Sequence, residues 1–143
     1  MLDVVIMAAG KGTRMKSARP KVLHQLAGRA LLQHVLATAA GLGAQRLITV
    51  TGHGAAEVEA AMRTAFPAAP LAFVRQEPQL GTGHAVQQAA PLLGEAGTTL
   101  ILNGDVPLIE AATARALVEA CGGTRLALLS IELADASGYG RIL

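Results

Sequence analysis

A short run of small and basic residues, 8–14 (AAGKGTR), has the composition of a phosphate-binding turn. Small side chains let a ligand approach the main chain closely, and Gly10 and Gly12 tolerate the positive φ angles of a tight turn. Successive backbone N–H groups in such a turn can bind an anion. The run differs from two well-known phosphate loops, because Met15 replaces the third glycine of the dinucleotide fingerprint and the GxxxxGK[ST] pattern is absent. We therefore expect an anion-binding turn of another kind.

Two basic side chains accompany this turn, Arg14 within it and Lys21 directly after Pro20. The Arg14 guanidinium offers a planar pair of donors to phosphate oxygens, and the Lys21 ammonium offers a point charge. The alternative is that both side chains only flank the turn in solvent. Their combination with the glycine-rich run favours phosphate binding.

The charge distribution supports an anion site in the first part of the chain. The 143 residues carry a net charge of +2. Residues 4–56 contain no Asp or Glu, but they contain the bases Lys11, Arg14, Lys16, Arg19, Lys21, Arg29 and Arg46. Such an unmixed cluster attracts either nucleic acid or a small phosphorylated ligand. Aromatic residues are 2% of the chain, so a base-stacking platform for single-stranded nucleic acid is excluded and we expect no nucleic-acid partner.

Asp105 follows an apolar run at residues 98–103 (TTLILN) and has two interpretations. A Mg²⁺ ion needs few protein carboxylates, because phosphate oxygens and water complete its shell, so one Asp at a strand end is sufficient. Alternatively, this carboxylate caps the Val106–Pro107 turn. The residues alone do not separate the two.

The cysteine and the histidines do not indicate a metal centre. Cys121 is the single cysteine, which excludes an intramolecular disulfide and a Cys-rich zinc site. The four histidines lack metal-ligand spacing, and we expect structural roles for His24 and His84, which lie beside the motifs. Because no apolar run has the length of a membrane span or the shape of a signal peptide, we expect a cytoplasmic protein with no membrane partner.

The elements that must position these residues alternate along the chain. Apolar, β-branched runs predict strands at residues 3–8, 46–50, 71–74, 98–103 and 126–131. Helical patterns that end at Gly or Pro lie between them, at residues 31–39, 58–66, 84–90 and 114–121. This order predicts a Rossmann-like α/β fold, an open, mostly parallel sheet with helices on both faces. Ligands bind such sheets at the carboxyl ends of the strands, where the candidate loops should meet.

Several motifs in order resemble the signature of the sugar-phosphate nucleotidyltransferases. They are residues 7–15 (MAAGKGTRM) with 20–23 (PKVL), 79–85 (QLGTGHA), 103–108 (NGDVPL) and 138–142 (GYGRI). Together they look like the N-terminal uridylyltransferase domain of the bifunctional bacterial enzymes that make UDP-N-acetylglucosamine. The resemblance runs from residue 4 to the last residue and implies a fold of the nucleotide-diphospho-sugar transferase type.

The resemblance implies a reaction of UTP with N-acetylglucosamine 1-phosphate that gives UDP-N-acetylglucosamine and pyrophosphate. This product feeds peptidoglycan and lipopolysaccharide synthesis, and so cell-wall biogenesis and cell shape. Arg14 and Lys21 would be the catalytic residues, because positioning and charge neutralisation dominate such a transfer. Mg²⁺ would be the cofactor and Asp105 its ligand in this chain.

The resemblance also assigns nucleotide and sugar-nucleotide contacts. They fall on Met7, Ala8, Ala9, Gly10, Lys21, Gln76, Gly81, Thr82, Asn103, Gly104, Asp105 and Gly140. Gln76, Gly81 and Thr82 would bind the uridine, since a Gln amide offers a donor and an acceptor to the O4 and N3–H edge of uracil. Asn103 departs from the aromatic residue common at this position in relatives.

The last residues, 138–143, begin like a turn that enters a new strand, so we expect a fragment. Residues 1–143 would be the nucleotide-binding part of the domain, while the sugar-binding remainder and the acetyltransferase β-helix would be absent. An oligomer could then form only through that missing C-terminal region. Two alternatives stay open: a fragment that binds nucleotide without turnover, or another nucleotidyltransferase of the same scaffold, such as a molybdopterin cytidylyltransferase.

Overall fold

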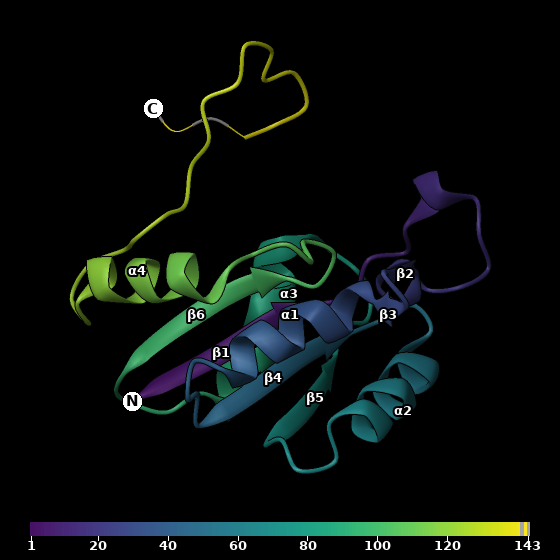
Figure 1. The fold of residues 1–143 in the computed structure, drawn as a ribbon, viewed down its shortest axis with the longest axis horizontal. Helices are drawn as coiled ribbons and strands as arrows, with labels where there is room; N and C mark the ends of the chain where they lie inside the picture. Colours follow the sequence, from purple (N-terminus) through teal and green to yellow (C-terminus); the bar gives the residue numbers. More distant parts are fainter. Residues whose placement is uncertain (141, 143) are drawn as a thin grey trace.

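Four parallel strands form the central sheet of the computed structural model, which describes residues 1–140 and 142. The strands lie in the order β5-β4-β1-β6. Their bounds are β1 Leu2–Met7, β4 Arg46–Thr51, β5 Leu71–Arg75 and β6 Thr98–Asn103. The chain adds β4 and β5 on one side of β1 and then crosses back to place β6 on the other side (Figure 1). This reversal leaves a crevice at the carboxyl ends of the central strands.

Helices cover both faces of the sheet, as predicted, and the alternation of side chains between the two faces explains why residues 4–7 of β1 are all apolar. Val4 and Ile6 pack in one core, against α1 (Leu31–Ala40), α2 (Ala55–Ala65) and α4 (Ala111–Cys121). Val5 packs in the other, against α3 (Thr82–Ala89). A strand buried on both faces reads as a continuous apolar run. No helix in the described part of the chain is long and apolar enough to cross a membrane.

The predicted helices and the first four predicted strands are confirmed, with ends that differ by a few residues. The structure adds 3-10 turns at η1 (Thr13–Met15), η2 (Lys21–Leu23) and η3 (Ala90–Leu92). It also adds a small antiparallel ribbon of β2 (Gln25–Leu26) and β3 (Arg29–Ala30). The two residues between these strands have φ angles of 49° and 77°, typical of a tight hairpin.

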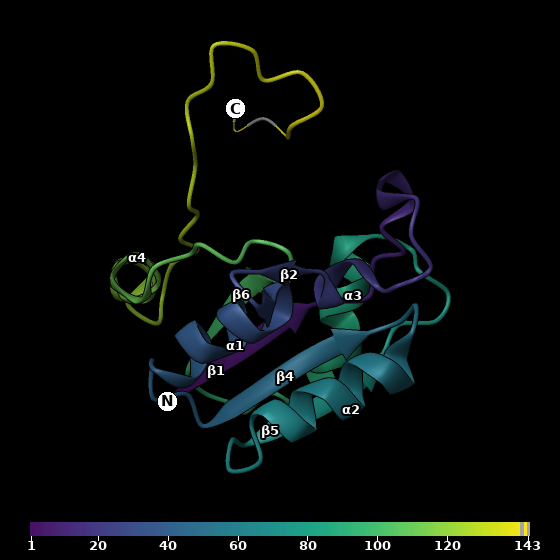
Figure 2. The same ribbon diagram turned by 45° about the vertical axis from the view of Figure 1, so that its right-hand side comes forward.

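The predicted strand at residues 126–131 is wrong. None of the described strands pairs with this segment, and Leu126 and Ile131 are 86% and 74% exposed. A strand requires a neighbour for its backbone groups, and this segment leaves α4 and extends away from the sheet instead (Figures 1 and 2). The fold class is unchanged by this correction.

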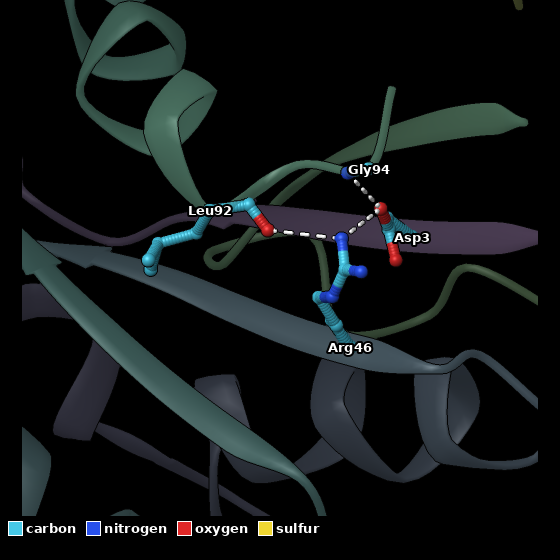
Figure 3. Close-up of polar contacts among 4 residues, drawn as sticks. All are labelled: Asp3, Arg46, Leu92 and Gly94. Atoms are coloured by element: carbon cyan, nitrogen blue, oxygen red, sulfur yellow. Dashed lines mark hydrogen bonds and ion pairs between the residues drawn. The ribbon is translucent and has the colours of Figure 1, made fainter. Parts of the chain in front are cut away.

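A polar network holds the amino ends of the strands, opposite the crevice. Asp3 of β1 is 5% exposed. Its Oδ2 accepts hydrogen bonds from Arg46 Nη1 and from Gly94 N, each at 3.1 Å (Figure 3). The same Arg46 nitrogen donates to Leu92 O, also at 3.1 Å. The network therefore joins β1, β4 and the segment after α3.

Candidate functional site

A pocket of about 550 Å³ opens at the carboxyl edge of the sheet. Met7 ends β1 and Asn103 ends β6 at its base, and the glycine-rich turn after β1 forms one wall. Residues from the segment 76–81, which joins β5 to α3, and from the first turn of α3 form another wall. This is the place that the reversal of strand order predicts for a ligand.

The turn after β1 is held by the neighbouring strand. Ala8 N donates to Val50 O at 2.8 Å, and Ala9 O accepts from His53 N at 3.3 Å. Beyond them Gly12 has a φ of 60°, and an added Cβ there would lie 2.6 Å from Lys21 Cβ. Glycine at position 12 is thus required both by the backbone conformation and by the close approach of Lys21.

Lys21 and Asp105 form an ion pair across the pocket, with 2.6 Å between Nζ and Oδ2. Their side chains are 38% and 35% exposed. Lys21 begins η2, and Asp105 lies two residues beyond the end of β6. Among the described residues, Lys21 is the partner of this carboxylate, and the turn that contains Asp105 is closed by Val106 N donating to Asn103 O. The capping interpretation of Asp105 therefore receives no support.

The donor set around Asp105 fits a metal ion held mainly by ligand oxygens. In the part of the chain that the structure describes, no three His, Cys, Asp or Glu side chains gather to hold a metal. Mg²⁺ is bound by one or two carboxylates when phosphates and water supply the remaining ligands. Asp105 meets that requirement, although Lys21 occupies one of its oxygens.

Gln76 is the buried polar residue of the pocket, at 5% exposure. Its backbone N–H donates to Thr51 O at 2.8 Å, which fixes it beside the end of β4. Its side-chain Nε2 donates to Gly81 O at 2.8 Å and lies 3.1 Å from His84 Nδ1. The amide nitrogen that we expected to face a base is thus engaged inside the protein.

The pocket collects all the predicted site residues except Gly104 and Gly140. Gly104 is buried beside the pocket, where its N–H donates to Met7 O at 2.9 Å. Gly140 belongs to the segment after α4, which extends away from the sheet (Figure 2). Arg141 of the same motif lies outside the described residues. The roles assigned to individual residues stay predictions.

Further residues line the pocket that were not among the individually predicted ones. They are Gly12, Thr13, Met15, Val22, Gln79 and Ala85. All of them fall within the motifs at residues 7–15, 20–23 and 79–85. The extent of the motifs, rather than the most reactive residues within them, was the signal that could have identified these positions.

A second hollow, of about 460 Å³, lies between β6, α4 and residues 125–129. Its wall is mostly aliphatic, with Leu100, Leu117 and Leu128 among the lining residues, and Arg125 is its charged side chain. The groups that can bind phosphate or a base lie in the first pocket, so we place the functional site there.

Comparisons with known proteins agree with this site. Residues 4–134 match the family model described as the MobA-like NTP transferase domain. The chain is 87% identical over 143 residues to the bifunctional protein GlmU of Methylibium petroleiphilum, an alignment that covers 100% of this chain and 31% of that protein. It is 63% identical over 149 residues to GlmU of a Polaromonas species, with 99% and 31% covered. The chain thus spans less than a third of these relatives.

Solved structures share the fold. A nucleotidyl transferase from Methanothermobacter has a TM-score of 0.66 and 27% identity, over 83% of this chain and 57% of that one. A UDP-glucose pyrophosphorylase complexed with UDP-glucose has a TM-score of 0.67 and 19% identity, over 84% and 52%. The Rossmann-like α/β fold, the nucleotidyltransferase class and the resemblance stated from the motifs are confirmed.

Proposed function

Because the chain belongs to the family of MobA-like NTP transferase domains, we propose that it is the nucleotide-binding part of a uridylyltransferase. In the proposed reaction an oxygen of N-acetylglucosamine 1-phosphate attacks the α-phosphorus of UTP. A new P–O bond forms as the bond to the β-phosphate breaks, and pyrophosphate leaves with the electron pair. The observation that carries the proposal is the convergence of Arg14, Lys21, Asp105 and Gln76 on one pocket. The identity to GlmU proteins supports the choice of substrates.

The basic side chains would neutralise the triphosphate. Arg14 lies in η1 and Lys21 begins η2, so both project from the turn segment that follows β1. Negative charge grows on the leaving pyrophosphate as the bond breaks, and positioned cations stabilise that charge. Lys21 would exchange its bond to Asp105 for one to a phosphate oxygen.

Asp105 would hold a Mg²⁺ ion in this part of the chain. When bound, such an ion polarises phosphate oxygens and neutralises their charge. Release of the Lys21 bond frees Asp105 Oδ2 for the ion, so one substrate phosphate would satisfy both the ammonium and the metal. In the free protein the ion pair would therefore hold Lys21 and Asp105 together, and substrate binding would break their bond.

The wall at residues 76–85 would bind the uridine. Gln76 Oε1 makes no hydrogen bond with a described residue and is the group that can accept the N3–H of uracil. Gly81 precedes α3 and Thr82 begins it, both on the pocket wall. This arrangement favours uridine over the cytidine of the alternative transferases.

The domain boundary is part of the proposal. We infer that residues 1–143 bind the nucleotide and that the sugar-binding part, the acetyltransferase region and any oligomer contact belong to the remainder of a GlmU-like protein. The chain should then bind UTP but release pyrophosphate far more slowly than a longer protein. In the cell this activity would supply peptidoglycan and lipopolysaccharide precursors from the cytoplasm.

Calorimetric titration with UTP in the presence of Mg²⁺ tests binding, and a pyrophosphate-release assay with both substrates tests turnover. Arg14→Ala should weaken UTP binding about tenfold or more, because a charge-assisted hydrogen bond is worth about 1.5–3 kcal/mol. The matched control is Arg19→Ala, which removes the same charge from an exposed residue of the same segment outside the pocket. Absence of UTP binding would overturn the proposal, and rapid turnover by the chain would overturn the domain boundary.

A further inference from the structure

Three polar side chains are linked behind the wall of the pocket: Gln76, His84 and Gln88. Gln76 Nε2 lies 3.1 Å from His84 Nδ1, and His84 Nε2 lies 3.1 Å from Gln88 Nε2. His84 and Gln88 are one helical turn apart on α3, and both are half-buried. The proposed reaction makes no use of His84, for which we expected only a structural role.

The carbonyl of Gly81 decides which way the Gln76 amide faces. Gly81 O lies 2.8 Å from Gln76 Nε2 and can only accept a hydrogen bond. The opposite orientation of the amide would place two acceptor oxygens against each other at this distance. The amide nitrogen must therefore face Gly81, and its second hydrogen is left for His84.

The hydrogen bond from Gln76 also determines which ring nitrogen of His84 carries the proton. Since Gln76 donates toward Nδ1, that ring nitrogen must be the acceptor, and the proton of the neutral ring lies on Nε2. Nε2–H then needs an acceptor, which Gln88 provides when its terminal amide turns to present Oε1. This flip of the Gln88 amide breaks its hydrogen bond to His84 O at 3.2 Å and brings two acceptor oxygens together there. It preserves the shorter bond of 2.8 Å from Gln76 Nε2 to Gly81 O.

With both amide hydrogens engaged, Gln76 offers the pocket an acceptor only. Uracil carries a hydrogen on N3, whereas N3 of cytosine is itself an acceptor. An acceptor held opposite N3 therefore pairs with uracil and meets a lone pair on cytosine. Selection between the two bases then depends on the contacts that prevent the Gln76 amide from flipping by about 180°.

We propose that His84 is a positioning residue that, together with Gly81 O, fixes the Gln76 amide as an acceptor and makes the pocket select uracil over cytosine nucleotides. The inference rests on the proposed function, in which Gln76 contacts the base. His84 touches no substrate. Its effect reaches the base through one hydrogen bond to Gln76.

The test compares UTP and CTP binding, each with Mg²⁺, in wild type and in His84→Ala. The wild type should prefer UTP by about tenfold or more, because cytosine would leave the acceptor oxygen of the buried Gln76 unpaired. His84→Ala should reduce that preference about threefold to tenfold, and the retained Gly81 contact should keep it from vanishing. His84→Asn, whose side-chain oxygen stands near the position of Nδ1, should restore it. Gln87→Ala is the control, an exposed neighbour on α3 outside the network.

A purely structural role of His84 would weaken both nucleotides equally and leave their ratio unchanged, which would overturn the inference. If the wild-type chain does not bind UTP, that result would instead overturn the proposed function. A second measurement needs no substitution: nitrogen-15 chemical shifts of the His84 ring in the wild-type chain. They should report a protonated Nε2 and a bare Nδ1, and a proton on Nδ1 of the neutral ring would contradict the assignment.

Discussion

Replacing Lys21 by Met should change metal binding and nucleotide binding in opposite directions. In the free protein, a metal ion at Asp105 competes with the ammonium 2.6 Å from Oδ2. The two side chains are 38% and 35% exposed, so the pair is weighed as a surface ion pair, worth about 0.2–1 kcal/mol. Its removal should strengthen metal binding without nucleotide by about 1.5-fold to fivefold, since 1.36 kcal/mol corresponds to tenfold. Loss of the like charge adds to this gain.

Nucleotide binding should weaken in the same variant. Lys21 would donate a charge-assisted hydrogen bond to phosphate worth about 1.5–3 kcal/mol, so UTP affinity should fall by about tenfold to 150-fold. Electron paramagnetic resonance of free Mn²⁺ measures the metal constant without nucleotide, and calorimetry measures the UTP constant. Lys16→Met is the matched control, since Lys16 is exposed in the same basic segment and lies outside the pocket. If both constants weaken together, the ion pair does not hold the two groups in competition, and the reasoning is refuted.

Two further substitutions test the frame of the site. Asp3→Asn should lower the free energy of unfolding by about 1–3 kcal/mol, because the bonds from Arg46 and Gly94 lose a buried charged acceptor. Urea denaturation measures the loss, and an unchanged midpoint would contradict it. Gly12→Ala should weaken UTP binding at least about fivefold, because a left-handed backbone costs about 1–2 kcal/mol and the new methyl meets Lys21. Calorimetry measures UTP affinity of the Gly12→Ala variant and the wild type at equal folded fraction. An unchanged affinity would contradict the argument that the new methyl displaces Lys21.

Burial patterns predicted the sheet because its strands are covered on both sides. Residues 4–7 of β1 are all apolar, since Val4 and Val5 face different cores, and such a run is typical of a parallel strand. The same signal failed at residues 126–131. An apolar pattern indicates that a segment can lie in a sheet, but the pairing depends on a neighbour that the pattern does not specify.

The location of the site was predictable for a geometric reason. The carboxyl ends of parallel strands coincide, so motifs after β1, β5 and β6 had to meet. The contacts between their side chains were not predictable. Lys21 and Asp105 are 84 residues apart, and their bond depends on where η2 lies over the end of β6. The link of His84 to Gln76 depends likewise on the angle at which α3 leaves the pocket wall, which no local pattern encodes.

The free side of β6 has a practical consequence for the behaviour of the chain in solution. Among the described residues β6 is paired only with β1, and Ile101 is 44% exposed on its uncovered face. An unpaired edge strand is a template for a further strand from another molecule. Leu128 and Leu129, each 61% exposed, add exposed apolar surface near this strand. We expect self-association to increase as stock solutions are concentrated, so calorimetric titrations will need dilute protein and a dilution control for self-association.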